Sequence, residues 1–157
     1  MASVTRGLSD FLHRYIPEIE KEMFEFLPIQ EPEAFLYAPM RDYPERGGKR
    51  FRPALVLLAC QVFDGNMKNA MRTAAAFEMF QSFAVVHDDI EDDSEMRRGK
   101  PCLHKMHGTP LSINVGDALY AKVFEILNAN RPLLGAEITL DLIEEMVNGS
   151  RETFEGQ

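Results

Sequence analysis

Residues 68–93 read KNAMRTAAAFEMFQSFAVVHDDIEDD, an apolar stretch that ends in a run of acidic residues. Apolar residues recur along it at the three- and four-residue spacing of an α-helix. The residues that define its packed face are Met71, Ala75, Met79, Val86 and Ile90. The spacing predicts one long helix over about 68–92. Because strand-like alternation is weak throughout the chain, we expect an all-α fold.

The segments on either side predict further helices, the first of which begins at Leu8 and is kinked or divided at Pro17. Residues 28–44 hold four prolines and predict an irregular connection, and residues 94–109 predict mostly loop. The other predicted helices cover about residues 53–62, 110–130 and 133–157. We find no repeat, linker or second domain. The last helix has no clear stop signal, which indicates a truncated domain.

The composition is that of a globular protein of 157 residues, with 45% hydrophobic and 27% charged residues. The two cysteines, Cys60 and Cys102, are too few for a disulfide framework and point to a reducing compartment. The longest apolar run, residues 54–60, is too short to span a membrane, and the first residues lack the apolar core of a signal peptide. We therefore expect a cytoplasmic protein without a transmembrane segment.

The net charge of −8 argues against binding to nucleic acid or to an anionic membrane. Basic residues nevertheless concentrate in two short stretches, 46–52 and 97–100. Small anionic ligands explain this distribution better than a polyanion does.

The acidic run at 87–93 points to a divalent cation. Asp88 and Asp92 are four residues apart and share one helix face, about 6 Å apart along the axis. Carboxylates at this spacing repel each other, and the helix dipole disfavours them at a C-terminal end. Mg²⁺ prefers carboxylate oxygens and keeps positions for water and phosphate. The alternative is a solvated acidic helix end. An EF-hand loop does not fit, because the spacing of the acidic residues differs and the required central glycine is missing.

The basic turn Arg46-Gly47-Gly48-Lys49-Arg50-Phe51-Arg52-Pro53 precedes a predicted helix, whose N-terminus attracts anions. It lacks the glycine spacing and the Ser/Thr of a Walker loop. The alternative is a set of basic residues that simply precede a buried helix. The second basic stretch, Arg97-Arg98-Gly99-Lys100, follows the acidic run. Carboxylates that hold a metal, followed by guanidinium groups that bind phosphate oxygens, would together bind a diphosphate. Zinc binding by Cys102, His104 and His107 is only a weak pattern.

In order and spacing, these segments resemble the trans-prenyl diphosphate synthases, the polyprenyl synthetase family. The matching pieces are the basic turn 47–53, Gln81, the DDxxD motif at 88–92, residues 97–101 and Gly116-Asp117-Ala118-Leu119. The resemblance covers about residues 46–157 and implies an antiparallel helix bundle of the isoprenoid synthase type, usually in a homodimer. It also implies that residues 1–157 are the N-terminal half of a single domain.

The resemblance further implies roles for individual residues. Asp88 and Asp92 would bind Mg²⁺, with Asp89 supporting them, and Arg97 would bind the allylic diphosphate. The residues that would bind isopentenyl diphosphate are Lys49, Arg52, Arg98 and Gln81. A metal-bound diphosphate leaves more readily, and the allylic cation is attacked by the isopentenyl double bond before a proton is lost. The chain shows no pattern that requires a protein nucleophile.

The family's second aspartate-rich motif has no counterpart in these 157 residues. We therefore expect the fragment to be inactive alone and to form a dimer or a larger assembly, because exposed apolar helix faces find partners. In the family, the positions four and five before the first aspartate help to set product length; here they are Ala84 and Phe83. One small and one bulky residue favour a C15 to C20 product, C20 slightly more, unless both residues simply pack the core.

Three rival functions remain open. A phosphohydrolase of the HD type would use the pair His87-Asp88 but needs further His and Asp ligands. A terpene cyclase also uses a DDxxD motif but does not need the isopentenyl diphosphate site at Lys49 and Arg52. A half-length relative that binds and regulates a complete synthase would need no catalysis, although its motifs would then be free to decay.

Overall fold

The computed structural model describes the backbone of residues 2–157 and the side chains of residues 9–157. The side chain of Leu8, with which the predicted first helix begins, lies outside the described residues. The long helices are α1 (Ala2–Glu25), α3 (Phe51–Val62), α4 (Met67–Glu91), α6 (Thr109–Asn128) and α8 (Ala136–Gly156). The short elements are the π-helical turn η1 (Glu33–Tyr37), α2 (Ala38–Glu45), β1 (Met96–Arg97), β2 (Lys100–Pro101), α5 (Leu103–His107) and α7 (Arg131–Leu134). The predicted all-α fold is confirmed.

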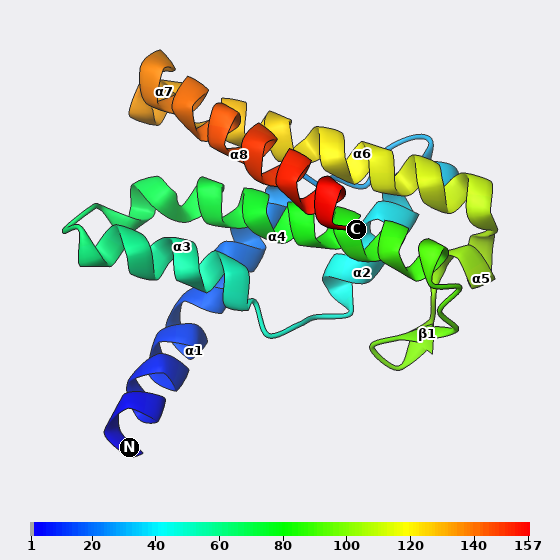
Figure 1. The fold of residues 1–157 in the computed structure, drawn as a ribbon, viewed down its shortest axis with the longest axis horizontal. Helices are drawn as coiled ribbons and strands as arrows, with labels where there is room; N and C mark the ends of the chain where they lie inside the picture. The colour runs from blue at the N-terminus through cyan, green and yellow to red at the C-terminus, as the bar shows by residue number, and fades with distance from the viewer. Residues whose placement is uncertain (1) are drawn as a thin grey trace.

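The central helix of the bundle is α4 (Figure 1). It packs against α3, α6 and the second half of α1, and α8 packs against α6. α6 runs back antiparallel to α4, and α8 returns in the direction of α4 (Figure 1). A short connection joins α3 to α4, whereas the hairpin and α5 lie between α4 and α6. No helix in the described part of the chain is long and apolar enough to cross a membrane.

The main core lies between α4 and α6. Four of the five residues predicted to form the packed face of α4 are buried, and Ile90 is half-buried. Alanines on α4 let the two helices approach closely, because the interaxial distance depends on the side chains at the contact. The buried residues of this layer include Ala75, Ala76, Met79, Val86, Val115, Leu119, Val123 and Ile126.

Two segments that the sequence predicts to be irregular contain regular structure. Residues 33–45 form η1 and α2, and Pro39 is tolerated because it lies in the first turn of α2, where no intrahelical N–H bond is lost. Residues 96–101 form a two-stranded hairpin in which Arg97 pairs with Lys100, and α5 follows it. α1 runs through Pro17 as one helix. The predicted last helix is divided at Gly135, whose φ of 85° ends α7.

Candidate metal and diphosphate site

The acidic run lies at the C-terminal end of α4, directly before the hairpin β1–β2 (Figure 1). Its three motif aspartates have different environments. The Asp88 side chain is 41% exposed, Asp92 caps the helix in an exposed position, and Asp89 is completely buried. Only Asp88 and Asp92 of these three can therefore reach an external ion.

The buried carboxylate of Asp89 is held by two partners. The Tyr43 hydroxyl donates to Asp89 Oδ2 at 2.5 Å. The Arg97 guanidinium donates to Asp89 Oδ1 through Nε at 2.9 Å and also through Nη2. The same Nη2 reaches Asp88 Oδ2 at 3.2 Å. Arg97 therefore bridges Asp89 and Asp88, and its single positive charge offsets one of their two negative charges.

These contacts set the charges of the site. Burial by itself would raise the pKa of Asp89, but the hydrogen bonds from Arg97 and Tyr43 outweigh it and hold the pKa below its ordinary value of 3.8. The hydrogen bond to Asp89 raises the pKa of Arg97. Burial, with the hydrogen bond to Asp89, raises the pKa of Tyr43. At neutral pH the site therefore contains a carboxylate, a guanidinium and a neutral phenol.

The oxygen donors at this helix end suit a hard cation. Within the described residues, no group of three or more His, Cys, Asp or Glu side chains is arranged to hold a metal ion. Two carboxylates one turn apart fit Mg²⁺, because this ion is often held by one or two carboxylates and completed by water and phosphate oxygens. The zinc alternative is not supported, because Cys102 is buried beside Asp89 and His107 is exposed.

The basic turn divides into buried and exposed residues. Arg50 is 2% exposed and forms ion pairs with Glu20 of α1 at 2.9 Å and with Glu78 of α4 at 2.6 Å. Lys49 and Arg52 are exposed, and their side chains make no hydrogen bond or ion pair with any described residue. The alternative that these basic residues simply precede a buried helix therefore fits Arg50. Lys49 and Arg52 remain available to a ligand.

Arg46 and Arg98 join the basic turn to the hairpin. The Arg46 guanidinium stacks 4.6 Å from the centre of the Tyr43 ring and donates to the carbonyls of Arg97 at 2.8 Å and Pro101 at 2.9 Å. Arg98 donates to the carbonyl oxygens of Tyr43 and Gly47. A Cβ on residue 48 would lie 3.1 Å from this guanidinium, so a glycine there permits the close approach. Burial lowers the pKa of Arg98.

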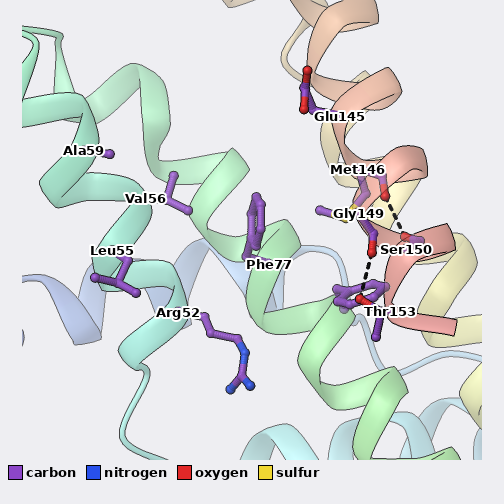
Figure 2. A pocket seen from close by; sticks show the side chains of 11 residues that line it. Arg52, Leu55, Val56, Ala59, Phe77, Glu145, Met146, Gly149, Ser150 and Thr153 are labelled. Carbon is purple, nitrogen blue, oxygen red and sulfur yellow. Dashed lines mark hydrogen bonds between the residues drawn. The ribbon is translucent and has the colours of Figure 1, made fainter. Parts of the chain in front are cut away.

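A cavity of about 510 Å³ lies between α3, α4 and α8 (Figure 2). Arg52 lines it from α3, Phe77 and Phe80 from α4, and Gly149 and Thr153 from α8. Most of its wall is apolar, with the Arg52 side chain at one end (Figure 2). Such a space can take a hydrocarbon group near a cation.

The two predicted product-length residues differ in burial, although both line the same small hollow. Phe83 is 6% exposed and lies in an aromatic cluster, 4.8 Å between ring centres from Tyr120 and 5.9 Å from Phe154. Ala84 is half-buried and lines a small hollow with Asp88. The alternative that these residues pack the core fits Phe83 better than Ala84. Gln81 is half-buried, about 10 Å along α4 from Asp88.

Several residues that build the site were not predicted from the sequence. Tyr43 was overlooked, and Arg46 was seen only as part of the basic turn, because Asp89 and the hairpin carbonyls that they bind lie 46 or more residues away in the sequence. His87 was considered only as part of an HD pair, yet its ring packs over Gly116 of α6. A Cβ on residue 116 would lie 2.2 Å from His87 Nε2. The Gly116-Asp117 piece of the resemblance is the signal that could have pointed to this contact.

An all-α bundle whose aspartate-rich helix end meets arginines from a hairpin defines a protein of the isoprenoid synthase class. The sequence pattern of the polyprenyl synthetase family matches residues 33–157. The chain belongs to this family, that of the trans-prenyl diphosphate synthases.

Three relatives illustrate the match. A geranylgeranyl pyrophosphate synthase of Geoglobus acetivorans is 43% identical over 70% of this chain and 34% of its own length. The chloroplastic small subunit of a heterodimeric geranylgeranyl pyrophosphate synthase of Arabidopsis thaliana is 33% identical over 99% of this chain and 49% of its own length. The crystal structure of a geranylgeranyl pyrophosphate synthetase from Pyrococcus horikoshii is similar with a TM-score of 0.90 and 34% identity, over 99% of this chain and 46% of that one. The chain thus spans less than half the length of each.

Proposed function

We propose that this chain forms the part of a short-chain trans-prenyltransferase that binds Mg²⁺, an allylic diphosphate and isopentenyl diphosphate. The observation that carries the proposal is the meeting of Asp88, Asp89 and Arg97 at one helix end, which Arg46 and Arg98 join to the basic turn. The names of relatives, geranylgeranyl and geranylfarnesyl diphosphate synthases among them, support the reaction class.

Each residue has a stated task in this proposal. Asp88 and Asp92 hold Mg²⁺, which neutralises the negative charge that develops on the leaving diphosphate. Arg97 binds the allylic diphosphate beside them through Nη1, because Asp89 and Asp88 engage its Nε and Nη2 and hold the guanidinium in place. The residues that bind the diphosphate of isopentenyl diphosphate are Lys49, Arg52, Arg98 and Gln81.

Residues 1–157 form the N-terminal half of one domain in this proposal, and we expect them to be inactive alone. They act in the cytoplasm as a homodimer or larger assembly. The second candidate function is a non-catalytic partner that regulates a complete synthase. It is favoured by one observation, the match of 99% of this chain to a protein named as the small subunit of a heterodimeric synthase.

Binding of Mg²⁺ and inorganic pyrophosphate, measured by titration calorimetry, tests the proposed site. We expect Asp88→Asn and Asp92→Asn each to weaken pyrophosphate binding in Mg²⁺ at least tenfold, because each removes one metal-ligand charge. Asp93→Asn is the matched control, since Asp93 belongs to the same run but pairs with Lys105 at 2.6 Å. Equal affinities for the parent and for the Asp88 and Asp92 variants would contradict the assignment.

For product length, we propose that Phe83 limits the depth available to the growing chain while Ala84 leaves room. The expected product lies between about C15 and C20, with C20 favoured. In an active enzyme that also contains the rest of the domain, we expect Phe83→Ala to lengthen the product. Chromatography of the dephosphorylated alcohols measures the product length. An unchanged product distribution would place the limiting wall elsewhere.

A further inference from the structure

A buried tyrosine of α2 joins three separate parts of the candidate site. Tyr43 is 2% exposed. Its hydroxyl donates to Asp89 Oδ2 of α4 at 2.5 Å and accepts the backbone N–H of Leu103, at the start of α5, at 3.2 Å. Its ring lies under the Arg46 guanidinium, which binds the carbonyls of the hairpin. The phenol thus has its one proton and one acceptor site engaged.

The Tyr43 hydroxyl also fixes the orientation of a carboxylate. Asp89 Oδ2 accepts from Tyr43, so that Oδ1 remains for the Arg97 guanidinium. Arg97 held in this way reaches Asp88 Oδ2 at 3.2 Å. The hydrogen bonds form a series from Tyr43 through Asp89 and Arg97 to Asp88. Because Asp89 is fully buried, a lost partner would leave Oδ2 without water to replace it.

We propose that Tyr43 is a positioning residue of the diphosphate-binding end of α4: its hydroxyl orients Asp89, which holds Arg97 beside Asp88. This inference rests on the proposed function, and it adds a residue that lies 45 positions before the first metal-ligand aspartate. A purely space-filling ring could be phenylalanine. The hydroxyl is needed only for the two hydrogen bonds described above.

Tyr43→Phe tests the positioning role, because it keeps the ring under Arg46 and removes the hydroxyl alone. The matched control is Tyr37→Phe in η1, since Tyr37 is half-buried and its hydroxyl has no hydrogen bond to a described residue. Amide hydrogen exchange of Leu103 is the first readout. We expect it to be at least tenfold faster in Tyr43→Phe and unchanged in Tyr37→Phe. Unchanged exchange in Tyr43→Phe would overturn the positioning role.

The second readout separates positioning from general stability. With inorganic pyrophosphate and Mg²⁺ as the probe, we expect Tyr43→Phe to weaken binding at least fivefold in the parent and less than twofold in an Arg97→Ala background. Equal losses in both backgrounds would overturn the proposal, because the hydroxyl would then not act through Arg97. A parent chain that does not bind pyrophosphate would contradict the proposed function, and the exchange of Leu103 would still decide whether the hydroxyl positions this segment.

Discussion

The guanidinium of Arg50 lies inside the bundle and contacts three elements. It pairs with Glu20 of α1 and Glu78 of α4, and it donates to the carbonyl oxygen of Pro44 in α2 at 2.6 Å. Arg50 itself has a left-handed φ of 47° at the start of α3, which turns the chain between its two neighbours, Lys49 and Phe51. One side chain therefore fixes the entry of α3 relative to the rest of the fold.

Replacement of Arg50 should be costly. We expect Arg50→Met to lower the free energy of unfolding by about 3–5 kcal/mol, because it leaves the Glu78 carboxylate buried without its partner. Lys49→Met, the exposed neighbour, should change it by less than about 0.5 kcal/mol. Urea unfolding followed by circular dichroism measures both. A loss below about 1 kcal/mol for Arg50→Met would show that the ion pairs do not hold the bundle.

The lowered pKa of the Asp89 carboxyl group predicts that the fold becomes less stable in acid. Its pKa is lower in the folded chain than the ordinary 3.8, so the unfolded chain binds a proton more readily as the pH falls. The stabilising contribution is therefore fully present above about pH 5 and is lost as the pH falls through the folded pKa. We expect the urea midpoint of the parent to fall between about pH 5 and pH 2, and to fall less steeply in Asp89→Asn. A parallel decline in both proteins would contradict this origin.

Residues close in sequence were predictable, and those that meet only in the fold were not. The pairing of Asp88 with Asp92 follows from one helical turn, which the local sequence specifies. The burial of Asp89 depends on Tyr43, 46 residues earlier, and on a hairpin that the sequence analysis treated as loop. For the same reason the sequence did not show that distant glutamates hold Arg50, a member of the basic turn, in the interior.

Between the elements α4 and α6, the His87 ring lies directly against Gly116. We expect Gly116→Ala to destabilise the chain by about 1–3 kcal/mol, since the new Cβ would lie 2.2 Å from His87 Nε2. Gly149→Ala in α8 is the control. Among the described residues, no atom beyond its chain neighbours and its own helix backbone lies within 4 Å of the added Cβ, so alanine should stabilise the helix by about 0.5–1 kcal/mol.

The origin of this effect can be tested with a double-mutant cycle. His87→Ala removes the ring that the new methyl group would meet, and Gly116→Ala should then cost at least about 1 kcal/mol less than it does in the parent. Thermal unfolding monitored by calorimetry gives the required differences. Additive effects of the two substitutions would mean that residue 116 is constrained by something other than His87.

Element prediction succeeded where a helix buries a continuous apolar face. The α4 and α6 helices show this, because their own spacing defines them. The η1–α2 segment was predicted to be irregular from its prolines, yet Pro39 lies in a first turn and Pro44 in a last turn, where tertiary contacts support the helix. The hairpin has strands of only two residues, too short for a periodic signal, and Arg46 of α2 binds it.

At the scale of the whole molecule, several large apolar side chains face outward. Examples are Val62 and Phe63 at the end of α3 and Leu140 and Val147 on α8, all between 47% and 85% exposed. Exposed apolar surface favours association. We expect sedimentation velocity at micromolar concentrations to show a dimer or a larger species, and the monomer fraction to rise on dilution. A single monomeric species across the concentration range would contradict this expectation.

The chain's last residue lies at the candidate site, since Gln157 Nε2 donates to Glu91 Oε2 at 2.9 Å. The first described residue, Ala2, begins α1 at a far end of the molecule (Figure 1). A polyhistidine purification tag fused after Gln157 would thus start beside the carboxylates of α4 and add imidazole ligands to any titration with a divalent cation. A tag placed before α1 keeps those imidazoles away from the acidic helix end, and it is the better choice for every metal measurement described above.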